Sequence, residues 1–277
     1  MEIQIACCQF APEVGQSAGN ETLVRSAIAT AVAGGAQIVV LPELANSGYR
    51  FDSAGEARAA ATPVDGALLA GWAHEAGDAL VIGGFCELAD DGTVYNSSAL
   101  VHGGGVMALY RKLHLWHDEP RWFAPGQQPA PVVQTRYGAI GLALCYDLEF
   151  PELTRGLALD GAELIALPTN WPREEDSAAP GSGPILSLLA RATAYLSKVF
   201  VAVCDRNGSE RGLEFQGGSV IVGRDGEILA GPPPQGETAT IWATVDLAQA
   251  ADKRSGERND ALADRRPAYY APSLQRP

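Results

Sequence analysis

Three apolar runs of the sequence end abruptly at a residue that can do chemistry. They lead into Glu43, Lys112 and Cys145, which are a carboxylate, an ammonium and a thiol. If each run is a strand of an α/β sheet, its end lies at the edge where ligands bind, so side chains distant in sequence can share one pocket. There a carboxylate can take the thiol proton, the thiolate can attack a carbonyl carbon, and an ammonium can stabilise the oxyanion.

Cys145 is the candidate nucleophile among five cysteines. Pro151, six residues later, is typical of the first turn of a helix, and a helix amino terminus or a nearby ammonium would favour the thiolate. The alternative is a buried cysteine that acts as a small hydrophobe, with Glu43 and Lys112 as ordinary surface charges. By that reasoning the cysteines inside predicted strands are core residues, namely Cys7, Cys8, Cys86 and Cys204.

The segments Leu-Pro-Glu43, Arg-Lys112-Leu-His and Leu-Cys145-Tyr-Asp-Leu-Glu-Phe-Pro-Glu152 resemble, in order and spacing, the three signatures of the nitrilase (carbon–nitrogen hydrolase) superfamily. The similarity extends over nearly the whole chain, from Ile3 to Pro267. It implies an α/β fold, a four-layer α-β-β-α sandwich, and the catalytic residues Glu43, Lys112 and Cys145. It also implies that Glu119 positions the substrate.

The resemblance implies an amidase that forms a thioester on Cys145 and releases a carboxylic acid and ammonia, without a cofactor or a metal. Glu43 would carry protons in both half-reactions, while Lys112 and the backbone N–H of Tyr146 would stabilise the oxyanion. Of the nearby histidines, His114 is expected to pack or hydrogen-bond and His117 to lie on the pocket rim.

Asp147 and Glu149, which follow the candidate nucleophile, indicate the substrate class. An aspartate two positions after the cysteine resembles the amidase and carbamoylase branches of the superfamily, whereas nitrile-cleaving members usually have Trp-Glu after their cysteine. Glu149 stands where relatives acting on substrates with a second carboxylate often carry arginine. If Glu149 faces the pocket it repels an anionic tail, which favours a neutral or cationic amide. If it points away into a salt bridge, the preference disappears. A nitrile or an N-carbamoyl amide remains an alternative substrate.

Aromatic residues near the motifs predict a small pocket with aromatic walls. The side chains expected to line it are Tyr49, Trp116, Glu149, Asn170 and Trp171, with Trp122 and Phe123 nearby and some of the aromatics serving only as packing.

Two other interpretations of the sequence, a serine esterase and a non-catalytic interaction module, have less support. Gly15-Gln-Ser17-Ala-Gly19 with His102-Gly-Gly-Gly105 is similar to elements of serine esterases. However, in esterases the HGGG element precedes the serine, and a histidine follows late in the chain, whereas here none occurs beyond His117. A non-catalytic interaction module would require a broken triad, and all three residues are present.

Ten short β-branched or alternating runs predict a sheet-rich core, and four alanine-rich stretches between them predict helices, which together indicate α/β layering in a single domain. The predicted strands are 3–9, 38–41, 80–86, 97–101, 106–110, 140–144, 164–167, 199–203, 219–222 and 241–245. The predicted helices are 21–32, 68–76, 151–159 and 184–197.

Composition limits the partners. The 277 residues include 33 acidic and 20 basic ones, and this negative balance disfavours nucleic acid and anionic membranes. No apolar run approaches the roughly 18 residues of a membrane span, no basic leader precedes the first predicted strand, and the cysteines have no CxxC spacing. We therefore expect a cytoplasmic protein with reduced thiols. Relatives commonly pair through the helix after the cysteine, which implies a homodimer or larger. The extension 246–277 either packs on the body, packs on a partner subunit, or frays.

Overall fold

The fold is built on two six-stranded sheets. The computed structural model describes residues 1–173 and 184–270. The first sheet has the order β14-β1-β2-β3-β4-β5, and the second has the order β13-β12-β9-β8-β7-β6. The strands of the first sheet are β1 (Ile3–Gln9), β2 (Ile38–Val40), β3 (Leu80–Leu88), β4 (Val94–His102), β5 (Gly105–Arg111) and β14 (Ala239–Val245). Those of the second are β6 (Val132–Thr135), β7 (Gly138–Leu142), β8 (Leu164–Pro168), β9 (Phe200–Cys204), β12 (Val220–Val222) and β13 (Ile228–Ala230).

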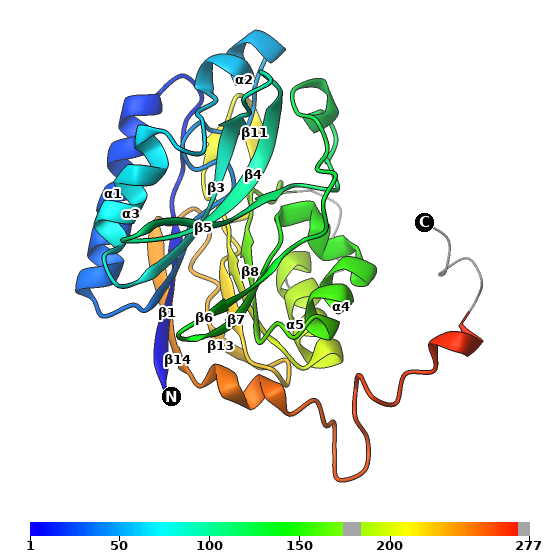
Figure 1. Cartoon of the computed structure of the whole chain (residues 1–277). Helices are drawn as coiled ribbons and strands as arrows, with labels where there is room; N and C mark the ends of the chain where they lie inside the picture. Colours follow the sequence, from blue (N-terminus) through cyan, green and yellow to red (C-terminus); the bar gives the residue numbers. More distant parts are fainter. Residues whose placement is uncertain (174–183, 271–277) are drawn as a thin grey trace.

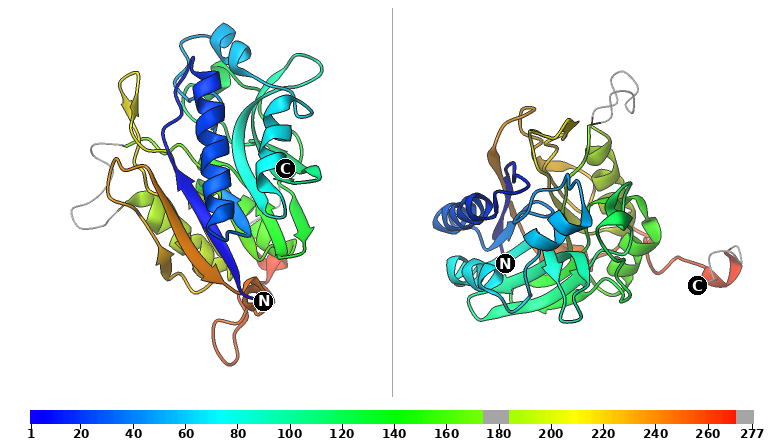
Figure 2. Two further views of the ribbon diagram at one scale, coloured as in Figure 1. Left: turned by 90° about the vertical axis from the view of Figure 1, so that its left-hand side faces the viewer. Right: turned by 90° about the horizontal axis from the view of Figure 1, so that it is seen from above.

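Helices cover the outer face of each sheet. The first sheet carries α1 (Ser17–Ala33) and α3 (Ala67–Ala76), and the second carries α4 (Pro151–Leu159) and α5 (Ile185–Ser197) (Figure 1). Figure 2 shows the same layers from the side and from above. The chain therefore has the expected four-layer α-β-β-α architecture.

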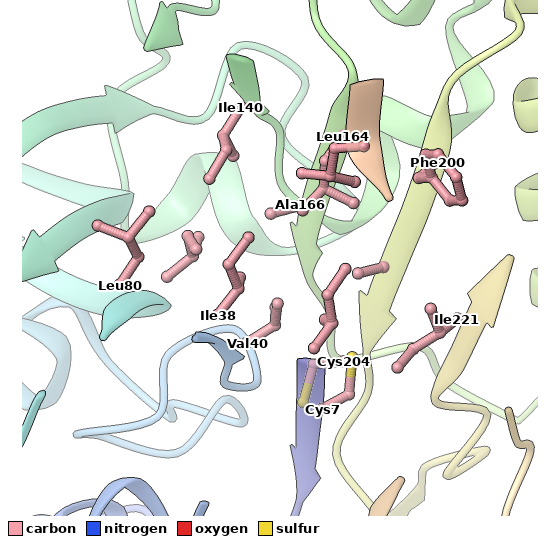
Figure 3. Close-up of a cluster of buried hydrophobic side chains, with 14 of the residues drawn as sticks. Cys7, Ile38, Val40, Leu80, Ile140, Leu164, Ala166, Phe200, Cys204 and Ile221 are labelled. Atoms are coloured by element: carbon pink, nitrogen blue, oxygen red, sulfur yellow. The ribbon is translucent and has the colours of Figure 1, made fainter. Parts of the chain in front are cut away.

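The core follows from the alternation of side chains along each strand. In β1, Ile3 and Ile5 lie between the sheets, whereas Cys8 packs beneath α1. In β8, Leu164 faces the other sheet and Ile165 faces α4 and α5. Figure 3 shows side chains from both sheets meeting in the middle layer. Because both faces of each sheet are buried, the central strands are apolar along most of their length.

The direction of the strands decides where their ends meet. Strands β1, β2 and β3 are mutually parallel, and so are β7, β8 and β9. Strand β5 pairs antiparallel with β4, which pairs antiparallel with β3, so β5 runs in the direction of β3. The segments that follow β2, β5, β7, β8 and β9 are consequently placed to gather at one edge of the two-sheet core.

All ten strands and all four helices expected from the sequence are present, with ends that differ by a few residues. The structure adds short elements within the described residues, namely α2 (Ala54–Ala60), β6, β10 (Ser209–Glu210), β11 (Leu213–Glu214) and β13. Helix α2 has only seven residues and depends on a local cap, since the Ser53 hydroxyl accepts a hydrogen bond from the Glu56 N–H at 3.1 Å. Such a short helix has little apolar periodicity to reveal it.

The extension that begins at residue 246 is fixed to the body over its first part. Leu247 is buried in the core between the sheets. Lys253 Nζ donates to the carbonyl oxygens of Ala162 and Lys198, at 3.4 and 3.0 Å. The segment contacts the body again at Ala261, whose carbonyl oxygen accepts from Arg155 Nη1 at 3.2 Å. It then leaves the body, as Figure 1 shows, and the Tyr269 side chain is exposed. Residues 271–277 lie outside the described part of the extension.

Within residues 1–173 and 184–270, no helix combines the length and the apolar character required to cross a membrane.

Candidate active site

The first predicted site residue, Glu43, lies where the two sheets meet. It follows β2 by three residues, and its N–H donates to the Thr169 carbonyl beyond β8 in the other sheet, at 3.4 Å. Strand β3 approaches this segment closely at Gly84, where a Cβ atom would lie only 2.5 Å from the Glu43 Cα. A glycine is therefore required at this position for the carboxylate to sit against the sheet.

Lys112 lies between two carboxyl groups. Its Nζ donates to Glu43 Oε1 at 2.7 Å and to Glu119 Oε1 and Oε2 at 2.8 and 3.0 Å. All three side chains are buried. Asn96 Nδ2 also donates to Glu43 Oε1, at 2.8 Å, whereas Glu43 Oε2 has no hydrogen-bond partner among the described residues. One oxygen of Glu43 is thus fixed by two donors, and the other is available for proton transfer.

Burial and mutual charge set the protonation of this group. Burial alone would lower the pKa of Lys112, but the charges of Glu119 and Glu43 outweigh it and raise the pKa well above its usual value. Burial raises the pKa of Glu119 to about 7, although the Lys112 ammonium acts in the opposite direction. Lys112 therefore remains a cation, while Glu119 can change its charge near neutral pH.

Cys145 lies within electrostatic reach of all three groups, and it rests as a thiol. Burial raises the pKa of Cys145 well above its usual value, and the Glu43 carboxyl raises it further. The Lys112 ammonium lowers the pKa of Cys145, as expected for a nearby cation, but burial and the Glu43 charge outweigh it. Helix α4 begins at Pro151, as predicted, and the thiol before it is desolvated. A base must therefore remove its proton when it reacts.

The turn that presents the thiol is held by a buried carboxylate. Cys145 begins a 3-10 helix and has a φ of 43°, an uncommon conformation for a residue with a side chain. Asp147 accepts hydrogen bonds from the Leu144 N–H at 3.0 Å and from the Tyr110 hydroxyl at 2.7 Å. Its other oxygen lies 2.7 Å from His114 Nδ1. Since Tyr110 and His114 flank Lys112, Asp147 connects the ammonium and thiol segments.

His114 also stacks on Phe150, with ring centroids 3.5 Å apart, which fits the packing and hydrogen-bonding role expected for it. His117 is exposed at the rim of a cavity beside the site, also as expected.

Two adjacent cavities open at the site and share Trp116 as a wall. The smaller, of about 30 Å³, lies over Cys145 and is lined by Trp116, Tyr146, Glu149, Trp171 and Pro172. The larger, of about 250 Å³, is lined by Tyr49, Glu119 and Trp122, among others. Glu149 thus faces the cavity over the thiol. Phe123 is buried in the cluster of side chains beneath the loops.

Asn170 contributes its backbone rather than its side chain to the immediate surroundings of the thiol. Its backbone N–H lowers the pKa of the Cys145 thiol, and its side chain is buried but does not line the smaller cavity. Both polar atoms of that side chain are without a hydrogen-bond partner in the described part of the chain.

Several residues that support the site were not predicted from the sequence. Tyr49 was expected only as a lining residue, but its hydroxyl donates to Glu119 Oε1 at 2.8 Å. Asp205, which was not singled out, accepts from the Trp171 N–H at 2.8 Å. Burial raises the pKa of Asp205 to about 7. The available signal was the pattern that marked the other positions, since β9 ends at Cys204 and leads directly into Asp205 and Arg206.

The two segments that are similar to serine-esterase elements, at Ser17 and His102, do not lie together in the structure. Ser17 is exposed at the start of α1, which follows the carboxyl end of β1. His102 ends β4, which runs opposite to β3, so it lies at the other edge of the sheet. No group of three or more His, Cys, Asp or Glu side chains among residues 1–173 and 184–270 is arranged to hold a metal ion.

Comparison with known proteins gives consistent results. The carbon-nitrogen hydrolase family model matches residues 4–255. A nitrilase of Pyrococcus abyssi is 33% identical over 272 residues, which are 97% of this chain and 99% of the relative. An (R)-stereoselective amidase of a Pseudomonas species is 35% identical over 230 residues, which are 82% of this chain and 80% of the relative.

Among solved structures, an amidase from Nesterenkonia sp. is similar with a TM-score of 0.76 and 29% identity, over 91% of this chain and 94% of the other. In a variant of that amidase, acrylamide is bonded to the active-site cysteine.

Replacement of Lys112 by methionine is expected to destabilise the fold strongly, because it leaves two buried carboxyl groups without their common counter-charge. Loss of one partner from a buried ion pair typically costs about 3 to 5 kcal/mol. The matched control is Arg25→Met, which breaks the more exposed pair with Glu75 and should cost about 1 kcal/mol or less. Urea unfolding at pH 8 measures both, and equal midpoints would contradict the buried-charge argument.

Proposed function

Because the chain belongs to the carbon-nitrogen hydrolase family, we propose that it is an amidase that converts a small neutral or cationic amide into a carboxylic acid and ammonia, with Cys145 as nucleophile. The observation that carries this proposal is the buried arrangement of Glu43, Lys112 and Glu119 within electrostatic reach of one thiol.

In the first half-reaction Glu43 acts as general base. Its Oε2, which has no partner among the described residues, takes the proton of Cys145, and the sulfur attacks the amide carbon. Negative charge develops on the carbonyl oxygen. Lys112 and the backbone N–H of Tyr146 stabilise that oxyanion, and each such donor typically lowers the barrier by about 3 to 4 kcal/mol.

The tetrahedral intermediate then collapses. The carbon–nitrogen bond breaks, the nitrogen takes the proton from Glu43, and ammonia leaves a thioester on Cys145. Glu43, again a carboxylate, takes a proton from water while the water oxygen attacks the thioester carbon. The thiolate leaves, recovers the proton from Glu43, and the acid is released. One carboxylate thus serves both half-reactions, and the high pKa of the thiol explains why a base is required.

Glu119 has a positioning role in this scheme. Its two oxygens accept hydrogen bonds from Lys112, from the Tyr49 hydroxyl and from the Trp116 N–H. It therefore fixes the ammonium and the aromatic wall against which a substrate would lie, without transferring a proton itself.

The cavity over Cys145 supports a small substrate. Three aromatic residues and Glu149 line its mouth, and this combination favours a neutral or cationic group over an anionic one. Relatives of this chain include proteins named nitrilase, amidase and N-carbamoylputrescine amidase, so nitriles and N-carbamoyl amides are the alternative substrates. Ammonia release from a panel of aliphatic, aromatic and carbamoyl amides and nitriles discriminates among them.

We also propose that the chain forms a homodimer or a larger homo-oligomer through the α4–α5 face, with the extension 246–277 contributing to the contact. Apolar side chains are exposed on this face, namely Leu159 on α4 and Leu188, Tyr195 and Leu196 on α5. Several exposed apolar side chains gathered on one face are a common mark of a protein–protein contact.

We also propose that the protein works in the reducing environment of the cytoplasm. All five cysteines are free and buried, and none is placed in a disulfide.

Replacement of Cys145 by alanine should lower amide hydrolysis by about four orders of magnitude or more, because no other group can form the thioester. Cys86→Ala is the matched control, since this cysteine is equally buried but lies in β3. Ammonia release measures the rate, and mass spectrometry of quenched reactions should detect the acyl group on Cys145 in the parent protein only. Normal turnover by the Cys145 variant would reject the scheme.

Glu149→Gln should lower kcat/KM for a cationic amide by about threefold to tenfold, because it removes an exposed charge at the cavity mouth. Turnover of a neutral amide of the same shape is the internal control and should change little. Hydrolysis of a dicarboxylic monoamide should increase. Equal effects on all three substrates would show that Glu149 does not select by charge.

The double variant Leu188→Asp/Leu196→Asp should be a monomer of about 29.0 kDa, while the parent chain has at least twice that mass. Charges on the α4–α5 face cannot be buried against a second copy. Leu229→Asp, at an exposed apolar position on β13, is the control and should leave the mass unchanged. Light scattering after gel filtration measures the mass of each protein in solution. A monomeric parent chain would refute the proposal.

A further inference from the structure

A second buried ion pair lies next to the site, on residues that the reaction scheme does not use. Arg206 follows β9 and is fully buried, and its guanidinium contacts Glu210 Oε2 at 3.1 Å. Burial lowers the pKa of Arg206, while the Glu210 charge raises it. The guanidinium also lies 4.0 Å from the ring centroid of Phe215. A buried charge pair is costly to desolvate, so its retention calls for a reason other than stability alone.

Glu210 collects hydrogen bonds from three separate segments of the chain. Its Oε1 accepts from the Val14 N–H at 2.9 Å, and its Oε2 accepts from the N–H groups of Tyr49 and Arg50 at 2.8 and 2.7 Å. Arg206 is the fourth donor. A carboxylate can accept all four hydrogen bonds, whereas a neutral amide of the same shape cannot.

The segment that Glu210 holds is packed without spare room. Gly48 has a φ of 74°, and a Cβ atom there would lie 2.3 Å from the Val14 nitrogen and 2.5 Å from Glu210 Oε1. The backbone at residue 48 therefore packs directly against Val14 and the Glu210 carboxylate. The Tyr49 ring is fixed on its other side by edge-to-face contact with Phe215, with ring centroids 5.8 Å apart.

Tyr49 connects Glu210 to the buried charges of the site. Its hydroxyl donates to Glu119 Oε1 at 2.8 Å, and the same oxygen accepts from Lys112 Nζ at 2.8 Å. A continuous chain of contacts thus leads from Arg206 and Glu210, through Tyr49 and Glu119, to Lys112.

We propose that Glu210 is a positioning residue for amide hydrolysis, which sets the Tyr49 hydroxyl against Glu119 and thereby holds Lys112 at the oxyanion. This inference rests on the proposed function. It assigns Glu210 no contact with the substrate, and it makes the segment from Arg206, after β9, to Glu210, in β10, a support for the site. Because Lys112 acts on the transition state, the loss of Glu210 should lower kcat more than it raises KM.

A double-mutant cycle tests the proposal with Glu210→Gln and Tyr49→Phe. Each single variant should lower kcat by about tenfold, which corresponds to one lost hydrogen bond to a buried charge. In the Glu210→Gln background, Tyr49→Phe should have almost no further effect, because its hydroxyl is already displaced. If the two losses multiply instead, Glu210 does not act through Tyr49, and the proposal is overturned.

The controls separate positioning from stability. Glu56→Gln removes the carboxylate that pairs with Arg211 on the surface, and it should leave kcat unchanged. If Glu210→Gln does not fold, Glu210→Asp takes its place in the cycle, because it keeps the charge but is too short to reach Val14 and Tyr49 together. The same coupling is expected, and multiplicative losses again overturn the proposal.

A crystal structure of the Glu210 variant provides a readout that is independent of activity. The hydrogen bond between the Tyr49 hydroxyl and Glu119 should be lost or lengthened beyond 3.5 Å. An unchanged contact overturns the proposal even if the variant is slow. If the parent chain hydrolyses no amide in the panel, the proposed function fails, while this structural comparison still decides whether Glu210 positions Tyr49.

Discussion

One buried ammonium shared by two buried carboxyl groups is the constraint on which the site depends. Lys112 is held at 2.7 to 3.0 Å from Glu43 and Glu119, and the nearby thiol is protonated because it is buried among them. A group of this kind is stable only if each charge keeps its partners, since a displaced partner leaves an uncompensated buried charge. The surrounding structure therefore has to be rigid as well as apolar.

The two facing sheets supply that rigidity. Parallel strands in each sheet bring the segments after β2, β5, β7, β8 and β9 to one edge, and the hydrogen bond from Glu43 to Thr169 joins the sheets there. Buried carboxylates then fix the loops to one another. Asp147 connects the thiol turn to the residues around Lys112, and Asp205 holds Trp171. The polar groups at this edge thus form one connected layer above an apolar core.

The sequence was informative about the elements and about the residues at strand ends. Strand alternation and helix periodicity are local, so the strands and helices of the core could be predicted. Glu43, Lys112 and Cys145 were candidates because each follows such a strand and lies in a segment that resembles a family signature. The upward shift of the Cys145 pKa was not predicted, because it depends on burial by segments far away in the sequence. Other contacts join residues that are far apart in the sequence. The distance along the chain is 70 positions for Tyr49 and Glu119, 34 for Asp205 and Trp171, and 196 for Glu210 and Val14. Such contacts follow from the assembled fold, and no local pattern reveals them.

The burial of the charged group has a further consequence for the environment in which the protein works. Dissolved ions screen charges only where solvent can surround them, over a distance of about 8 Å at physiological ionic strength. Lys112, Glu43 and Glu119 have almost no contact with solvent, whereas Glu149 stands at the open mouth of the cavity. Salt can therefore weaken the attraction of a charged molecule to Glu149 at the cavity mouth. The electrostatic interactions among the three buried side chains remain nearly unchanged. The chemistry inside is insulated from the ionic composition outside.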